Sequence, residues 1–247
     1  MKQTRILMDM PITVEICGPD AKQYDIDQVF EYFVSVDSQF SMFRETSEVS
    51  KFNAGVLGES DLSDDLRQIR TWCERTREET NGFFNAQRDG RFDPTGLVKG
   101  WAIYQAAHKL LEVGYEHFAV EAGGDIQSIG SNAEGKPWTI GIRNPLVTSE
   151  IVKVIAPGDR GVATSGSYFR GDHVVDPVQG ASLNDIVSVT VIASNVFHAD
   201  RFATACFAMG RSGIDFLEKR SNLAGYMIDR EGMATWTTNF TSYVVEP

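Results

Sequence analysis

The sequence predicts an α+β fold in which helices flank a largely antiparallel sheet. Short apolar runs separated by turn residues fill most of the second half of the chain, and segments with a helical period precede and interrupt them. No Pro-, Gly- or Ser-rich linker and no internal repeat divides the 247 residues. With 42% hydrophobic residues available for a core, we expect one compact, mixed α/β domain over residues 1–247.

Helices are predicted where apolar residues recur every three or four positions. Asn81-Gly82 and Gly114 each follow such a segment and favour its end, because Asn and Gly accept the left-handed backbone conformation. The polar and aromatic segment from Asp37 to Asn53 predicts a loop with one short helix. The predicted helices are Ile26–Val36, a short one near Ser47–Phe52, Ser63 to about Thr80, Gly96–Val113, Val196–Met209 and Gly213–Lys219.

Strands are predicted from short apolar or alternating runs bounded by turn residues. The run after Gly123-Gly124 is an example, since a Gly pair favours a tight connection between two strands. The predicted strands are Ile12–Cys17, Phe118–Glu121, Ile126–Ile129, Trp138–Ile142, Glu150–Ile155, Gly161–Ser165, His173–Val175 and Ile186–Ala193, with a closing hairpin of Gly225–Asp229 and Met233–Thr237.

The charge and cysteine content limit the classes of function. A net charge of −11 argues against nucleic acid or an anionic membrane as a partner, because both require a basic surface. Cys17, Cys73 and Cys206 lack metal-ligand spacing, and widely separated cysteines favour a reducing compartment. The N-terminal residues lack an apolar signal region, and no run reaches the length of a membrane span. We therefore expect a cytoplasmic protein without a membrane anchor.

Two separated motifs predict a metal-assisted site for a phosphorylated ligand. The segment from Asp93 to Gly100 brings a carboxylate, a Gly and Lys99 to the start of a helix, and a Lys there suits a phosphate group. Asp200 and Thr204 are four residues apart, so they share one face of a later helix. Carboxylate, hydroxyl and carbonyl oxygens are the ligands that a hard divalent cation prefers.

Each of these signals also has an ordinary structural explanation. An isolated Asp-x-x-x-Thr is commonly a solvated Asp and a Thr bonded to its own helix, but the apolar run from Phe202 to Met209 predicts that this helix is buried. His173 precedes an Asp-Pro turn and is a candidate to face a ligand. Gly123-Gly124-Asp125 is typical of a tight turn, and the chain contains no Walker loop and no G-x-G-x-x-G motif after a strand.

Taken together, these segments resemble the FAD:protein FMN transferases, the ApbE-type flavin transferases. The resemblance runs over most of the chain and depends on the order of its pieces. They are Phe40–Phe43 with Ser47–Asn53, Asp93–Ala102, Gly123–Ile126, Ala163–Tyr168, His173–Gly180, Ser188–Val191 and Ala199–Thr204. The chain departs from the family pattern at Asp9-Met10, where Gly-Thr is expected, and at Phe84-Asn85, where Phe-Asp is expected.

The resemblance implies an ApbE-like (T-fold-like) domain that binds FAD, with Mg²⁺ at the pyrophosphate. It assigns the metal ligands to Asp200, Thr204 and the carbonyl of Gly96. Lys99 and Asp93 fall on positions that bind the flavin nucleotide. The full set of flavin-binding positions is Met8, Phe43, Phe83, Phe84, Asn85, Asp93, Lys99, Ser165, Gly166 and Val175.

The function that the resemblance implies is transfer of FMN from FAD to a Ser or Thr hydroxyl of an acceptor flavoprotein, with release of AMP. His173 is the candidate general base, since an imidazole titrates near neutral pH, although a His satisfied by a backbone carbonyl is the alternative. Three other readings stay open: an Mg²⁺-dependent FAD pyrophosphatase that yields FMN and AMP, a non-catalytic FAD-binding protein, and an α/β domain unrelated to flavins.

Overall fold

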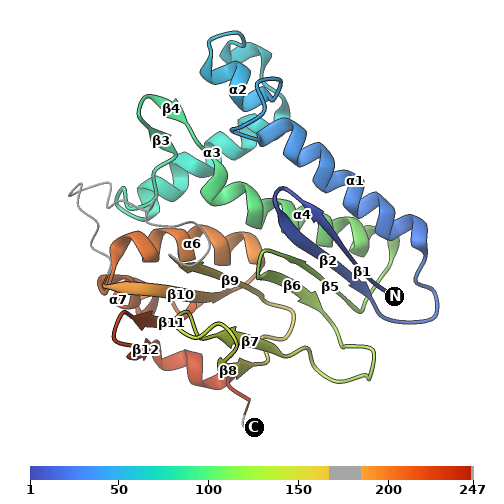
Figure 1. Cartoon of the computed structure of the whole chain (residues 1–247), viewed down its shortest axis with the longest axis vertical. Helices are drawn as coiled ribbons and strands as arrows, with labels where there is room; N and C mark the ends of the chain where they lie inside the picture. The colour runs from blue at the N-terminus through green and yellow to red at the C-terminus, as the bar shows by residue number, and fades with distance from the viewer. Residues whose placement is uncertain (167–184, 246–247) are drawn as a thin grey trace.

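Eight antiparallel strands form the main sheet of the computed structural model, which describes residues 1–166 and 185–245 (Figure 1). Their order across the sheet is β1-β2-β5-β6-β9-β10-β11-β12, and each neighbouring pair runs antiparallel. The bounds are β1 Lys2–Leu7, β2 Met10–Ile16, β5 Phe118–Ala122, β6 Asp125–Ile129, β9 Gly161–Gly166, β10 Ile186–Ala193, β11 Ala224–Asp229 and β12 Ala234–Trp236. The predicted α+β class and antiparallel sheet are confirmed.

Two hairpins stand apart from this sheet. The first pairs β3 (Gln87–Arg88) with β4 (Arg91–Phe92), and the second pairs β7 (Ile140–Arg143) with β8 (Ile151–Ile155). The strand predicted at His173–Val175 lies outside the described residues.

Helices α1, α4 and α6 cover one face of the main sheet, and α2 and α3 lie beyond them (Figure 1). Their bounds are α1 Gln23–Phe40, α2 Glu48–Asn53, α3 Asp64–Glu79, α4 Thr95–Val113, α6 Val196–Met209 and α7 Ser212–Glu218, with short 3₁₀ helices at Glu59–Asp61 and Thr238–Tyr243. Side-chain caps fix several of their starts: Ser47, Ser63 and Asn195 each accept a hydrogen bond from a backbone N–H of the first turn. Gly114, with φ of 101°, ends α4 as the sequence predicts.

The main sheet consists of two halves that are joined by few backbone pairs. Between β6 and β9 only Ile126↔Val162 and Gln127↔Gly161 are in register. Helix α4 packs on the first half, against β5 and β6, and α6 packs on the second half, against β9 and β10. Because α4 and α6 also pack on each other, the residues at their contact lie over the junction of the two halves.

The apolar side chains form two cores on opposite faces of the sheet. The larger core fills the space between the sheet and the helices and includes Phe30, Leu97, Trp101 and Val191. The smaller core lies under β7 and β8 and includes Ile142, Ile192 and Tyr226. Strand β10 contributes to both cores, which explains why its sequence is an almost continuous apolar run instead of an alternating one.

The hairpin at the N-terminus was not predicted from the sequence. Strands β1 and β2 are joined by Met8 and Asp9, whose φ values are 53° and 58°. A two-residue turn with two positive φ angles usually contains Asn and Gly, so Met-Asp gave no turn signal. Asp89-Gly90 joins β3 to β4 with φ values of 50° and 75°, and there the usual Asp-Gly signal was present and was not used.

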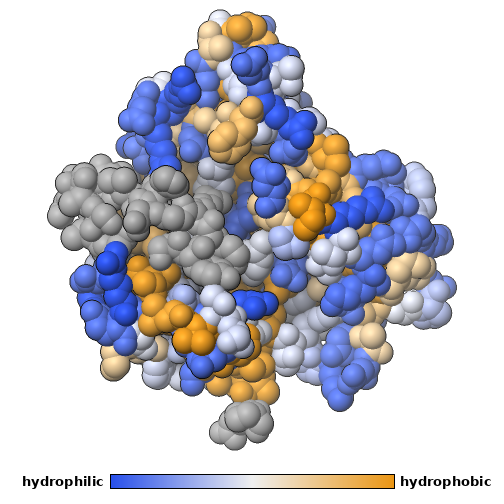
Figure 2. All heavy atoms as spheres, viewed as in Figure 1, coloured by the Kyte–Doolittle hydropathy of each residue, from blue (hydrophilic) through white to orange (hydrophobic). Residues whose placement is uncertain are grey.

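The surface is mixed in character. On the face seen in Figure 2, hydrophilic residues predominate around the start of α1, and hydrophobic residues gather near the turn between β1 and β2. Within residues 1–166 and 185–245, no helix combines the length and the apolar character that crossing a membrane requires.

Candidate functional site

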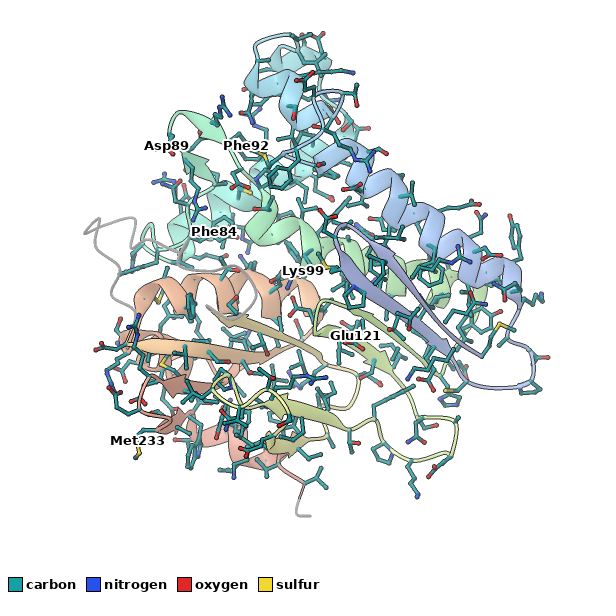
Figure 3. All side chains as sticks on the ribbon, in the orientation of Figure 1. Phe84, Asp89, Phe92, Lys99, Glu121 and Met233 are labelled. Atoms are coloured by element: carbon teal, nitrogen blue, oxygen red, sulfur yellow. The ribbon has the colours of Figure 1, made fainter. Side chains whose placement is uncertain are left out.

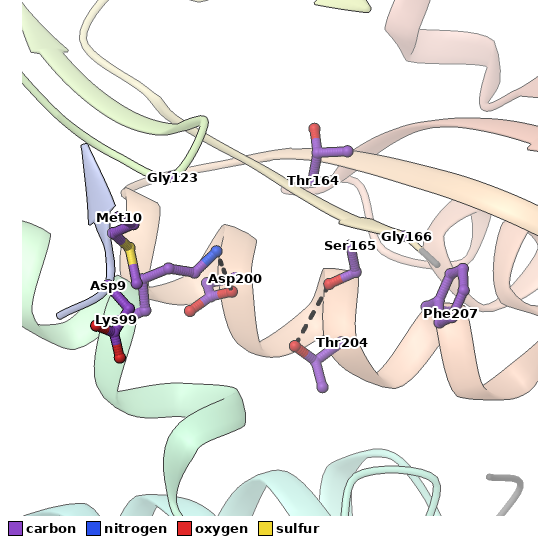
Figure 4. A pocket seen from close by; sticks show the side chains of 10 residues that line it. All are labelled: Asp9, Met10, Lys99, Gly123, Thr164, Ser165, Gly166, Asp200, Thr204 and Phe207. Carbon is purple, nitrogen blue, oxygen red and sulfur yellow. Dashed lines mark hydrogen bonds and ion pairs between the residues drawn. The ribbon is translucent and has the colours of Figure 1, made fainter. Parts of the chain in front are cut away.

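A pocket of about 190 Å³ lies where α4 and α6 meet the sheet (Figure 4). The turn after β1, the Gly turn before β6 and the end of β9 complete its walls. The residues that line it are Asp9, Met10, Lys99, Gly123, Thr164, Ser165, Gly166, Asp200, Thr204 and Phe207. The fold thus brings five residues of the predicted site together, namely Lys99, Ser165, Gly166, Asp200 and Thr204.

The close approach of the two helices depends on Gly100. Its backbone N–H donates a 2.7 Å hydrogen bond to Asp200 Oδ2, which spans the contact between α4 and α6. A Cβ atom on Gly100 would lie 2.5 Å from Asp200 Cβ and 3.0 Å from the carbonyl oxygen of Val196. The Gly of the Lys-Gly pair is therefore required by packing, since any larger residue would push Asp200 away.

Lys99 lies between two buried carboxylates. Its Nζ is 2.5 Å from Asp125 Oδ2 and 3.7 Å from Asp200 Oδ1. Asp125 is completely buried at the start of β6, and its other oxygen accepts a 3.0 Å hydrogen bond from the N–H of Thr164. This side-chain bond continues the pairing of β6 with β9 at the point where their backbone pairing stops.

Burial is the main influence on the pKa of Asp125. Removal from water raises this pKa above its usual value, the Lys99 ammonium opposes the rise, and the negative charge of Asp200 adds to it.

Three oxygens from facing helices supply a donor set that suits Mg²⁺. The Thr204 hydroxyl donates a hydrogen bond to the carbonyl oxygen of Gly96 at 3.2 Å, and the Asp200 carboxylate lies one helical turn before Thr204. Adjacent oxygen ligands of an octahedral Mg²⁺, each about 2.1 Å from the ion, are about 3 Å apart, which matches the spacing of Thr204 Oγ1 and Gly96 O.

The balance of charged and neutral ligands also fits Mg²⁺. No group of three His, Cys, Asp or Glu side chains with metal-binding geometry occurs in the part of the chain that the structure describes. Mg²⁺ is commonly held by one or two carboxylates, with water and substrate phosphates completing its shell. One carboxylate with two neutral oxygens is consistent with that pattern.

Asp93 has a local role at the start of α4. Its carboxylate accepts hydrogen bonds from the backbone N–H and the hydroxyl of Thr95, at 3.0 and 2.6 Å. The first of these bonds gives a partner to a backbone N–H that would otherwise be unpaired at the start of α4, the helix that carries Gly96, Lys99 and Gly100. Asp93 does not line the pocket of the described residues, so its assignment to ligand binding stays a prediction.

The other predicted flavin-binding positions in the described residues lie outside this pocket. Phe84 is buried in the main core beneath the start of α4, where its ring would lie 3.3 Å from a Cβ on Gly96 (Figure 3). Phe43 is 92% exposed in the loop after α1. Asn85 is exposed, Phe83 and Met8 are half-buried, and their assignments stay predictions. His173 and Val175 lie outside the described residues.

Several residues at or beside the pocket were not assigned from the sequence. Asp125, which contacts the pocket residue Lys99, was noted only as part of a Gly-Gly-Asp turn, a signal that most often marks a plain turn. Its burial and its contact with Lys99 follow from the pairing of distant strands, which spacing does not reveal. Asp9 and Met10 reach the pocket because of the N-terminal hairpin that was missed.

A second pocket adjoins the first. It has a volume of about 90 Å³, lies between the main sheet and the β7–β8 hairpin, and shares Gly123, Thr164 and Gly166 with the first pocket. Its other walls include Ile140, Ile142 and Val187, so it is more apolar. An elongated ligand with a charged part and an apolar part would match the two pockets together.

Comparison with known families gives a match over much of the chain. The ApbE family model matches residues 86–227. The FAD:protein FMN transferase of Vibrio cholerae is 38% identical over 128 residues, which are 48% of this chain and 38% of that protein. The protein of the same name from Escherichia coli K12 is 33% identical over 166 residues, which are 62% of this chain and 47% of that protein. The chain thus spans less than half the length of these two curated relatives.

Solved structures have the same fold. The flavin transferase ApbE from Vibrio cholerae superposes with a TM-score of 0.85 at 23% identity, over 98% of each chain. The ApbE protein from Thermotoga maritima superposes with a TM-score of 0.89 at 21% identity, over 100% of this chain and 99% of that chain. At these identities the likeness establishes the architecture and the order of its elements.

Proposed function

Because this chain belongs to the ApbE family, we propose that it transfers FMN from FAD to a Ser or Thr hydroxyl of an acceptor flavoprotein and releases AMP. Curated relatives that bear the name FAD:protein FMN transferase support the reaction class. The observation that carries the proposal is the contact of α4 with α6, where Lys99, Asp200 and Thr204 line a single pocket and the Thr204 hydroxyl bonds to the carbonyl of Gly96.

The pocket suits the pyrophosphate of FAD. In a chain of net charge −11, an anionic ligand needs local positive charge, and Lys99 supplies it among the residues that line the pocket. The adjoining apolar pocket suits a ring system of the same ligand. A dinucleotide is long enough to occupy both.

Asp200, Thr204 and the carbonyl of Gly96 would hold the Mg²⁺ ion, in agreement with their donor chemistry and the 3.2 Å spacing of two of them. Bound there, Mg²⁺ neutralises phosphate charge and makes AMP a better leaving group. Lys99 would bind a phosphate oxygen and orient the FMN phosphorus toward the acceptor.

The transfer is a displacement at phosphorus. The oxygen of the acceptor hydroxyl forms a bond to the FMN phosphorus, the bond between this phosphorus and the bridging oxygen breaks, and AMP leaves with that oxygen and its electron pair. The hydroxyl proton goes to a base, for which His173 is the candidate. The product is a flavin joined to the acceptor by a phosphoester bond.

The experiment that tests this function incubates the protein with FAD, Mg²⁺ and a candidate acceptor flavoprotein. Covalent flavin on the acceptor, with one AMP released for each flavin attached, is the expected result. Release of AMP and free FMN in equal amounts without labelled acceptor would instead establish a pyrophosphatase. FAD that binds and stays intact with several acceptors would favour a binding protein.

A further inference from the structure

We propose that Asp125 is a positioning residue that holds the Lys99 ammonium away from Asp200, so that Asp200 remains available to a cation. The inference rests on the metal site of the proposed function and adds a residue to it. It concerns the ion pair at the pocket and the two distances that define it, 2.5 Å from Lys99 Nζ to Asp125 and 3.7 Å to Asp200.

Asp125 is fixed in place before any ligand arrives. Its side chain is completely buried, and the Thr164 N–H holds Oδ1 at 3.0 Å. Oδ2 is left to face Lys99, whose side chain is 13% exposed. A buried carboxylate needs a compensating charge, and the Lys99 ammonium provides it.

Asp200 is fixed in the complementary way. Its Oδ2 accepts the hydrogen bond from the Gly100 N–H, which directs Oδ1 toward Lys99 and the pocket. At 3.7 Å the contact of Oδ1 with the ammonium is longer than a hydrogen bond, so this oxygen keeps a lone pair for another partner.

The two carboxylates compete for one flexible cation. A Lys side chain has several rotatable bonds, so its ammonium moves readily to the stronger partner. If a substitution removes the charge of Asp125, Asp200 becomes the stronger partner of the Lys99 ammonium. The ammonium would then move next to Asp200 and occupy the position that a metal ion needs. Asp125 therefore raises the cation affinity of the site without contacting the cation.

The test measures binding of Mn²⁺, a Mg²⁺ surrogate, by the loss of its free electron paramagnetic resonance signal. It is done without FAD and with saturating FAD, so that weaker FAD binding by a Lys99 variant is not mistaken for weaker Mn²⁺ binding. Asp125→Asn keeps the shape of the side chain and an oxygen for the Thr164 N–H, and removes the charge. We expect it to weaken Mn²⁺ binding about 10-fold or more. Asp25→Asn is the matched control, since Asp25 is a buried Asp on α1 that accepts a hydrogen bond from the Tyr115 hydroxyl and is not part of the ion pair of Lys99 with Asp125.

The double variant Asp125→Asn with Lys99→Met separates positioning from structural damage. Lys99→Met removes the ammonium that competes with the metal ion for Asp200. The Mn²⁺ affinity of the double variant should therefore lie within about threefold of wild type, although this variant carries one more substitution than Asp125→Asn. Lys99→Met alone should bind Mn²⁺ at least as tightly as wild type. Circular dichroism and thermal unfolding establish that each variant is folded.

Two results would overturn the inference alone: Asp125→Asn that binds Mn²⁺ as wild type does, or a double variant as weak as Asp125→Asn. If Asp125→Asn does not fold, Lys99→Met decides the matter, because a loss of Mn²⁺ affinity in that variant contradicts competition by the Lys. Absence of Mn²⁺ binding by the wild type, with and without FAD, would overturn the metal site of the proposed function and this inference with it.

Discussion

The backbone N–H of Gly100 donates a hydrogen bond of 2.7 Å to the carboxylate of Asp200, and this bond joins α4 to α6 at the pocket. The two residues are 100 positions apart in the sequence. Their contact turns two motifs, each ambiguous by itself, into one site, because it fixes the Asp that would bind the metal beside the Lys that would bind phosphate.

Gly100→Ala should destabilise the protein and impair the site. The new Cβ would lie 2.5 Å from Asp200 Cβ, so α4 and α6 must separate. We expect the free energy of unfolding to fall by about 2 kcal/mol and Mg²⁺-dependent AMP release from FAD to fall by about 10-fold or more. Urea unfolding and chromatography of AMP provide the two measurements. Gly58→Ala is the control, because Gly58 is exposed and a Cβ there would contact only Asp61 Oδ2, at 3.4 Å. If the two substitutions lowered stability and activity equally, the close packing at Gly100 would not be the cause.

Thr204→Val should weaken the metal site and leave the helix intact. The change replaces the hydroxyl by a methyl group of similar size and removes the hydrogen bond to the Gly96 carbonyl. We expect the Mg²⁺ concentration for half-maximal AMP release to rise by about 10-fold. Thr204→Ser keeps the hydroxyl and should stay close to wild type. A Ser variant as impaired as the Val variant would show that the methyl group, and not the oxygen, matters.

His198 should make the protein less stable in mild acid. Burial and the adjacent Arg201 charge lower the pKa of His198 from 6.5 to about 4, and its Nδ1 accepts a 3.0 Å hydrogen bond from Arg201 Nε. In the unfolded chain, His198 therefore binds a proton below about pH 6.5, whereas in the folded chain it binds one only below about pH 4. Stability that is complete above pH 6.5 should decline as the pH falls through this range.

His198→Asn tests that decline because the Asn oxygen can still accept from Arg201 without titrating. The free energy of unfolding, measured in urea at a series of pH values, should depend less steeply on pH between 6.5 and 4 in the variant. Parallel pH profiles of wild type and variant would mean that other groups cause the acid sensitivity.

Asp9→Gly should stabilise the N-terminal hairpin. Asp9 has φ of 58°, a conformation in which Gly lacks the steric cost of a side chain. We expect the free energy of unfolding to rise by about 0.5 to 1 kcal/mol. The same change at Asp20, an exposed loop residue without a positive φ, should lower it instead. A fall in stability for Asp9→Gly would show that its carboxylate makes a contact worth more than the relieved strain.

Much of the fold could be predicted because local signals agreed with the final structure. Ser63 precedes α3 and Gly114 follows α4, and both boundaries were predicted from the sequence. The cap of α6, Asn195, was seen only in the structure. The antiparallel sheet followed from short apolar runs with turn residues between them. Strand β1 was missed because its polar sequence and its Met-Asp turn are unusual for a hairpin, and only pairing with β2 makes it a strand.

The candidate site was predictable in part. Lys99, Asp200 and Thr204 were identified from residue type and spacing, and the structure brings them to one pocket. Asp125 could not be assigned, because its role depends on burial and on a contact between β6, β9 and α4 that no local pattern encodes. Phe84 was predicted to contact the flavin, and the structure places it in the core behind Gly96.

The most direct test of a metal-assisted site at Asp200 is AMP release from FAD by wild type and by Asp200→Asn, with and without Mg²⁺. The Asn side chain still accepts the hydrogen bond from Gly100 and lacks the charge that would hold the ion. We expect Mg²⁺-dependent AMP release by the wild type and a loss of about 100-fold in the variant, with an unchanged circular dichroism spectrum. Equal release by the two proteins, or release by the wild type that persists in excess chelator, would contradict a metal-assisted site at the contact of α4 with α6.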